Sequence, residues 1–156
     1  MSTRSVLLIN IFQDYNEGNP NRGLRTAQYY HHYDGYIEGV GKDLIFKFNE
    51  LIDGKGRLID SLYGLESDIK NNFPAAYGRE HTELIHDDIE FLYTLTKEQG
   101  SNNITLCAYD RGGYNNTFNS YDEFILKSDK QVLAVWNWSI NSNYYYLQSI
   151  NYNGKF

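Results

Sequence analysis

Short apolar runs, and stretches in which apolar and polar residues alternate, recur along the chain and predict β-strands. They are rich in Val, Ile, Leu and aromatic residues, and clusters of Asn, Gly, Asp and Ser separate them. The pattern predicts strands at residues 5–12, 24–32, 89–96, 104–109, 131–140 and 144–152. We expect the first two strands to form one hairpin, and the third and fourth to form another.

Two longer segments carry apolar residues at helical spacing. The first predicts a helix at residues 40–53, which a Gly-Lys-Gly sequence ends. The second predicts a helix at residues 57–72, which a proline closes. Ser120 followed by Glu123 is typical of a capping box and predicts a further short helix at 121–126.

The order of these elements is strands, then two helices, then strands. This order predicts an α+β fold with an antiparallel or mixed sheet and two helices packed on one face. We find no internal repeat, linker or shift in composition, so residues 1–156 are expected to form a single domain. A chain of this length is long enough to bury a substantial hydrophobic core.

Charge and cysteine content exclude several classes of function. The net charge of −6 and the pI of about 5.1 argue against stable nucleic-acid binding, which normally needs a basic face. Cys107 is the only cysteine, so no internal disulfide forms, and a reducing cytosol fits the chain. No apolar run approaches the roughly 20 residues of a membrane span, so we expect a cytoplasmic protein without membrane association.

The segment from residue 29 to 44 holds the densest set of chemically active side chains. Gly35, Gly39 and Gly41 flank the predicted start of the first helix, and Lys42 lies in its first turn. Backbone N–H groups and the helix dipole at such a start favour an anion, and the lysine adds an ammonium group. The alternative is that the glycines only shape a tight turn.

Metal binding is less favoured than this anion site. His31 and His32 could join nearby carboxylates as ligands, but adjacent residues of a strand point to opposite faces. We therefore interpret the histidines as structural or surface residues, and we expect no metal and no cofactor.

The other reactive side chains favour structural roles over catalysis. Cys107 lies mid-strand, where a buried, inert thiol is usual. Asp87 and Asp88 are interpreted as a capped turn rather than a catalytic pair. Trp136 and Trp138 point the same way in a strand, which favours core packing over a stacking platform. We assign no catalytic residue.

Four short motifs occur in a fixed order along the first 110 residues. They are Thr-Arg-Ser at 3–5, His-Tyr-Asp-Gly-Tyr at 32–36, Gly-Val-Gly at 39–41 and Asp-Ile-Glu at 88–90. In this order and spacing the chain resembles a family of small proteins found widely in phages and prophages. Ile37 stands where that family has a proline, and the segment from Tyr114 onward lies outside the resemblance.

The resemblance implies a phage-related origin and, with it, a role against host defence. Small phage proteins of this kind often sequester a nucleotide signal or inhibit a protein effector. It also groups Arg4 and Gly35 with His32, Asp34 and Tyr36 as a set. The Arg4 guanidinium is interpreted either as a fork for a carboxylate or phosphate, or as the partner of Asp34 in a structural bridge.

We therefore expect a phage-type counter-defence protein in the host cytosol that sequesters a small anionic nucleotide-type ligand. The predicted ligand-binding residues are Arg4, His32, Asp34, Gly35, Tyr36, Gly39, Gly41 and Lys42. One alternative is an inhibitor that binds a host defence protein directly. Another is an enzyme that cleaves a nucleotide or phosphoester with His32 as acid or base. Homo-oligomerisation is compatible with all three, because sheet edges and exposed aromatics favour pairing.

Overall fold

The computed structural model describes residues 3–13, 23–31, 34–53, 80–81, 85–113, 116–139, 141 and 144–151. Its strands are β1 (Ser5–Gln13), β2 (Gly23–His31), β3 (Glu80–His81), β4 (Phe91–Lys97), β5 (Asn103–Asp110), β6 (Asp129–Ser139) and β7 (Tyr144–Ile150). The helices are α1 (Lys42–Ile52), which follows the π-helical turn η2 (Ile37–Gly41), and α3 (Tyr121–Lys127). Among the described residues, no helix has the length and apolar character that crossing a membrane requires.

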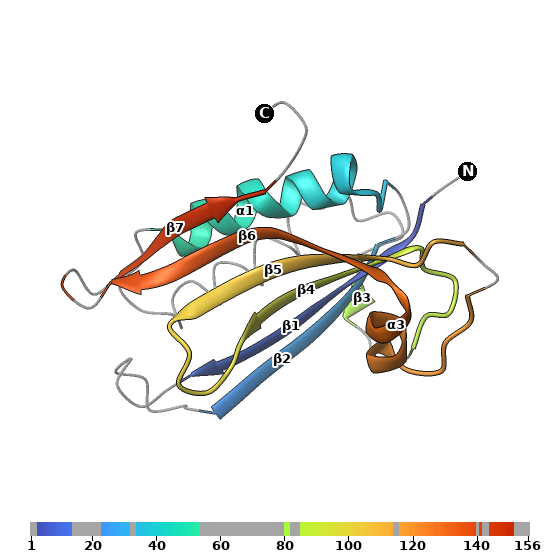
Figure 1. The fold of residues 1–156 in the computed structure, drawn as a ribbon, viewed down its shortest axis with the longest axis horizontal. Helices are drawn as coiled ribbons and strands as arrows, with labels where there is room; N and C mark the ends of the chain where they lie inside the picture. The colour runs from blue at the N-terminus through green and yellow to red at the C-terminus, as the bar shows by residue number, and fades with distance from the viewer. Residues whose placement is uncertain are drawn as a thin grey trace.

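The strands form one mixed sheet in the order β3-β2-β1-β4-β5-β6-β7 (Figure 1). Neighbouring strands are antiparallel except β1 and β4, which run parallel with Ser5 opposite Phe91. The predicted α+β fold and both predicted hairpins are confirmed. The two-residue strand β3 was not predicted, because it falls in a polar segment without a strand pattern and exists only through pairing with β2.

The two faces of the sheet differ in composition, because alternate residues of each strand point to opposite sides. On β1, Leu7 packs into the same apolar cluster as α1, whereas Val6 belongs to a second cluster with Phe124 of α3. The two described helices therefore lie on opposite faces. The prediction of two helices on one face concerned those at 40–53 and 57–72: α1 packs on the sheet as predicted, and the helix at 57–72 lies outside the described residues.

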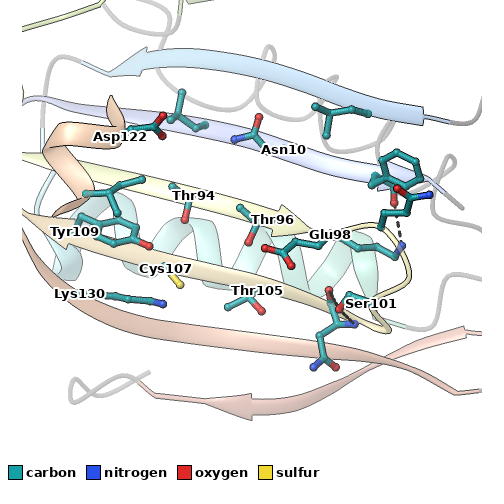
Figure 2. Close-up of a pocket in the computed structure, with 17 residues that line it drawn as sticks. Asn10, Thr94, Thr96, Glu98, Ser101, Thr105, Cys107, Tyr109, Asp122 and Lys130 are labelled. Carbon is teal, nitrogen blue, oxygen red and sulfur yellow. Dashed lines mark hydrogen bonds between the residues drawn. The ribbon is translucent and has the colours of Figure 1, made fainter. Parts of the chain in front are cut away.

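The face that carries α3 is polar over much of its area. Asn10 of β1 and Thr94 and Thr96 of β4 share this face, and Thr105 of β5 is the register partner of Thr96 (Figure 2). The short helix α3 is anchored at one end of the face by Phe124, whose ring meets that of Phe118 edge-on at 4.8 Å.

The predicted capping box at the start of α3 is confirmed in a shifted form. The Ser120 hydroxyl accepts a hydrogen bond from Glu123 N at 3.1 Å, and the Glu123 carboxylate accepts one from Asn119 N at 3.0 Å. The return bond therefore reaches one residue before the cap. Both bonds satisfy backbone N–H groups that the start of a helix leaves free.

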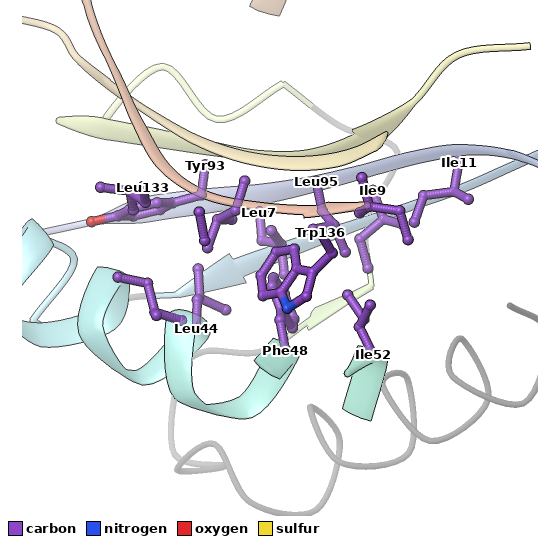
Figure 3. Packing of buried hydrophobic residues seen from close by; sticks show 14 of the residues in the cluster. Leu7, Ile9, Ile11, Leu44, Phe48, Ile52, Tyr93, Leu95, Leu133 and Trp136 are labelled. Carbon is purple, nitrogen blue, oxygen red and sulfur yellow. The ribbon is translucent and has the colours of Figure 1, made fainter. Parts of the chain in front are cut away.

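The face that carries α1 holds the main core. Phe48 and Ile52 of α1 pack against strand residues that include Leu95 and Trp136, all with less than 3% exposure (Figure 3). The indole Nε1 of Trp136 donates a hydrogen bond to Asn49 of α1 at 3.1 Å, so the buried polar atom has a partner. Trp136 and Trp138 both belong to this core, as the strand pattern predicted.

Candidate functional site

The glycines of the predicted site let the loop between β2 and α1 pack closely on the beginning of β1. Gly35 N donates to Thr3 O at 2.8 Å, and a Cβ atom at Gly35 would lie 2.8 Å from the same oxygen. A Cβ atom at Gly39 would overlap the carbonyl oxygen of Asp34, which itself adopts a left-handed conformation with φ of 54°. At Gly41 the neighbour is the ring of Tyr93. These contacts favour the tight-turn interpretation of the glycines.

The backbone N–H groups at the helix start already have partners. Val40 N donates to Asp34 O at 2.8 Å, and Gly39 N and Gly41 N donate to Tyr36 O at 3.0 and 3.4 Å. An anion at this point would have to compete with these carbonyl groups. The anion site of Gly39, Gly41 and Lys42 stays a prediction, and the hydrogen bonds do not favour it.

The charge around this loop is also negative. The carboxylate of Asp34, which accepts a hydrogen bond from the Tyr36 hydroxyl at 3.3 Å, raises the pKa of that phenol, and Glu38 adds a smaller effect in the same direction. Burial raises the pKa of Asp43 in the first turn of α1; the charges of Lys42 and Lys47 partly offset this increase, and Asp34 adds a smaller one. An anionic ligand at Asp34 and Tyr36 would face these carboxylates.

Tyr93 of β4 holds this loop against the sheet. Its side chain is fully buried, and its hydroxyl donates to Gly35 O at 2.6 Å. Burial raises the pKa of this phenol well above its ordinary value of 10.0. The hydroxyl therefore stays protonated in the folded protein and holds the loop to the sheet.

We expect Tyr93→Phe to lower the free energy of unfolding by about 1–3 kcal/mol, because Gly35 O loses its buried donor. We also expect wild-type stability to fall as the pH rises above 10, because the unfolded chain then releases a proton that folded Tyr93 retains. The variant should lose less stability over that pH range. Denaturant unfolding at pH 7 and at several pH values above 9 measures both effects.

Tyr36→Phe is the matched control, since Tyr36 is exposed and its hydroxyl contacts only the exposed Asp34 carboxylate among the described residues. Its effect should stay within about 0.5 kcal/mol. Equal losses in the two variants would contradict the anchoring role of Tyr93.

The backbone of Arg4 lies against this loop at Gly35, but the Arg4 side chain pairs with a residue outside the loop. Its Nε atom is 3.3 Å from a carboxylate oxygen of Asp88, which also accepts a hydrogen bond from the Tyr30 hydroxyl at 3.0 Å. Tyr30 in turn stacks on His86 with ring centroids 4.2 Å apart. Arg4 thus ties the beginning of β1 to the turn before β4, where the predicted turn at Asp87 and Asp88 is found.

The contact with Asp88 bears on the two interpretations of Arg4. In the described part of the chain its carboxylate partner is Asp88, and Asp34 contacts Tyr36 instead. A bridge from Arg4 to Asp34 is therefore not present there. His32 lies outside the described residues, so its approach to Arg4 stays a prediction.

A pocket of about 670 Å³ opens on the sheet face opposite α1 (Figure 2). Strands β1, β2, β4, β5 and β6 supply its floor, and Asp122 and Ile125 of α3 form a wall. Its polar lining includes Asn10, Thr94, Thr96, Glu98, Thr105, Tyr109, Asp122 and Lys130. None of the seven predicted site residues that the structure describes lines this pocket, which we call the sheet pocket.

Three buried side chains, those of Thr94, Cys107 and Tyr109, lie together in the floor of the sheet pocket. Cys107 is the register partner of Thr94 on β4, and Tyr109 follows two residues later on the same face of β5. Burial raises the pKa of the Cys107 thiol and of the Tyr109 phenol. Both therefore remain neutral near pH 7, which agrees with the predicted buried, inert thiol and leaves them as hydrogen-bond donors.

The charged groups of the sheet pocket are two lysines and two carboxylates. Lys97 is buried and donates to Phe12 O at 2.9 Å. Lys130 is exposed, and its ammonium charge lowers the pKa of Cys107 and of Tyr109, although burial outweighs this effect. Glu98 and Asp122 are exposed. A polar ligand would therefore meet both signs of charge around a hydroxyl-lined floor.

A smaller pocket of about 450 Å³ lies beside Arg111 and Lys127. Its Arg111 is buried and donates to the carbonyl oxygens of Asp87, Ile89 and Asn116 at 2.8, 3.2 and 2.9 Å. This guanidinium therefore holds the turn before β4 to the segment before α3. The sheet pocket is the better candidate for a ligand.

Two further findings bear on the assignment. No group of three or more His, Cys, Asp or Glu side chains within the described ranges is placed to hold a metal ion. No protein-family model matches the chain, and neither a curated protein nor a solved structure matches it significantly.

Proposed function

We propose that the protein is a binding protein that captures a small nucleotide-type ligand in the sheet pocket. The observation that carries this proposal is the 670 Å³ pocket itself, on a sheet face that α3 alone of the described helices covers in part. Its volume falls in the range of small-molecule sites, which is about 300–1,000 Å³. The opposite face of the same sheet is filled by the main core, so the floor of the pocket is rigid.

The lining suits the mixed chemistry of a nucleotide. Hydroxyl and amide groups of Asn10, Thr96 and Thr105 can donate to or accept from the base and the sugar. The carboxylates of Glu98 and Asp122 can accept from ribose hydroxyls. Apolar side chains beside them, such as Leu8 and Phe12, offer contacts for a base ring.

Capture without turnover fits the neutral state of the one thiol in the pocket. A thiol whose pKa is raised by burial is a poor nucleophile at pH 7. The use of this capture against host defence follows from the resemblance to phage proteins alone and stays a prediction. The enzyme alternative depends on His32, which lies outside the described residues.

Direct binding to a host protein is the second candidate. Strand β7 lies at the edge of the sheet and exposes Tyr144, Tyr146 and Ile150 at 37–43%. Exposed aromatics at an edge strand suit a protein interface, because the edge also offers backbone hydrogen-bonding groups. A stable complex with a host protein, formed without any small ligand, would favour this candidate. The edge variant Tyr146→Ala should weaken that complex.

A thermal-shift screen tests the proposed function. The panel holds mononucleotides, cyclic di- and trinucleotides and ADP-ribose derivatives, and mass spectrometry checks that each ligand stays intact. A ligand at 100 times its dissociation constant should add about 2.7 kcal/mol, or about 5–10 °C in Tm. Thr94→Val, which removes a hydroxyl from the pocket floor, should reduce this shift.

Thr26→Val is the matched control, because Thr26 is exposed on β2 and does not line the pocket. Lys42→Ala tests the predicted loop site in the same assay. A shift lost in Lys42→Ala and retained in Thr94→Val would place the ligand at the helix start and overturn the sheet-pocket assignment. A changed mass of the ligand would instead indicate turnover.

A further inference from the structure

The two ammonium groups of the sheet pocket are used differently. Lys97 is buried and already donates to the backbone of β1, so it joins β4 to β1. Lys130 is exposed and forms no ion pair with any residue in the described part of the chain. Of the two, Lys130 is the ammonium group that a ligand can pair with directly.

Lys130 lies beside the buried side chains of Thr94, Cys107 and Tyr109 in the pocket floor. It is the register partner of Tyr109 across β5 and β6, and Thr94 is the register partner of Cys107 across β4 and β5. Directly opposed side chains on one face of a sheet lie about 5 Å apart at Cβ. Four side chains from three adjacent strands therefore face one small volume, as Figure 2 shows at the end of the pocket near α3.

The protonation of this group favours an acceptor with negative charge. Burial keeps the Tyr109 phenol and the Cys107 thiol protonated near pH 7, so both carry a hydrogen to donate. The Thr94 hydroxyl is a third donor, and Lys130 supplies the positive charge. Phosphate oxygens accept hydrogen bonds and pair with ammonium groups, which makes a phosphate the complementary ligand group.

Asp122 of α3 is the carboxylate at this end of the pocket. It is exposed, and no ion pair to Lys130 is formed within the described residues. A carboxylate disfavours an inorganic anion but accepts a sugar hydroxyl. The pair of Lys130 and Asp122 therefore favours a phosphate that is attached to a sugar.

We infer that the end of the sheet pocket near α3 is a sugar-phosphate subsite, in which Lys130, Tyr109 and Thr94 bind the phosphate group. This inference rests on the proposed function. The sugar hydroxyls lie toward Asp122, and the rest of the ligand extends along Thr96 and Thr105. Lys130 is then the residue that distinguishes a nucleotide from its nucleoside.

The only cysteine of the chain provides a reporter inside this subsite. Because Cys107 is buried and neutral near pH 7, its slow alkylation by iodoacetamide in the folded protein is followed at pH 9, with AMP, adenosine or inorganic phosphate as probes. We expect AMP to slow alkylation at concentrations about tenfold below those that adenosine needs. Inorganic phosphate should protect more weakly than AMP, because Asp122 gains no hydroxyl partner.

Lys130→Gln should raise the AMP concentration for half-protection about tenfold and leave that of adenosine unchanged. Each variant is compared with its own alkylation rate without ligand, because the charge of Lys130 itself lowers the pKa of the Cys107 thiol. Lys127→Gln is the matched control: Lys127 lies on α3, pairs with Glu123 at 2.8 Å and does not line the sheet pocket. It should leave both values unchanged.

The outcomes separate this inference from the proposed function. Equal protection by AMP and adenosine, or an equal loss of AMP protection in both lysine variants, would overturn the phosphate subsite while the pocket still binds ligand. A ligand that shifts the Tm but never protects Cys107 would overturn both, since it binds elsewhere.

Discussion

Phe48→Ala is expected to lower the free energy of unfolding by about 3–5 kcal/mol. Phe48 is fully buried at the centre of the α1 face, and the structure places Leu95 and Trp136 of the sheet in the same cluster. Removing the ring deletes its buried apolar surface and leaves a cavity that α1 and the rigid sheet can fill only in part. Urea unfolding measures the loss as a lower midpoint with an unchanged slope.

Phe46→Ala is the control for this prediction. Phe46 lies on the same helix two residues earlier, and 48% of its surface is exposed, so it points away from the main core. Its loss should stay below about 1 kcal/mol. An equal loss of unfolding free energy in both variants would contradict the packing of α1 against the sheet through the side of the helix that carries Phe48.

Elements that depend on neighbouring residues could be predicted from the sequence. The helical spacing of Leu44, Phe48 and Ile52 already marks the buried side of α1, and the apolar run of β1 marks a buried strand. The hydroxyl of Ser120 and the backbone N–H of Glu123 lie within one helical turn, so the N-terminal cap of α3 could also be predicted from the sequence. Each of these signals acts over a few residues.

Contacts between distant segments could not be predicted in the same way. The parallel pairing of β1 with β4 joins residues 5–11 to 91–97, and no local pattern selects this partner over another strand. The same pairing brings Arg4 near Asp88, although the sequence motifs suggested Asp34 as its structural partner. Tyr93, which anchors Gly35, is likewise known only once β4 is placed.

The sheet pocket could not be predicted from the chain because its residues come from five strands, the turn between β4 and β5, and one helix. Alternation in the predicted strand at 89–96 put Thr94 and Thr96 on one side, but the side chains opposite them depend on strand register. A bulge between Leu106 and Cys107 also shifts the register with which β5 pairs with β6. The predicted motifs instead drew attention to the glycine loop, where backbone contacts explain the glycines.

Gly39→Ala is expected to lower the free energy of unfolding by about 3 kcal/mol. The added methyl group would overlap the carbonyl oxygen of Asp34, which is backbone and is already fixed by the hydrogen bond from Val40 N at 2.8 Å. Overpacking against backbone requires the loop to move, and this costs more than displacing a flexible side chain. Thermal and urea unfolding of the variant measure the loss.

Glu38→Ala, one residue earlier in the same turn, serves as the control, because Glu38 is exposed and its change should stay within about 0.5 kcal/mol. The pair of variants also separates the two interpretations of the glycine motif. A loss of stability in Gly39→Ala, with the ligand-induced shift in Tm retained, assigns the motif to the fold. Unchanged stability together with a lost ligand-induced shift in Tm would contradict the overlap with Asp34. The loop would then accommodate the added methyl group, and the loss of the shift would assign the glycine motif to ligand binding.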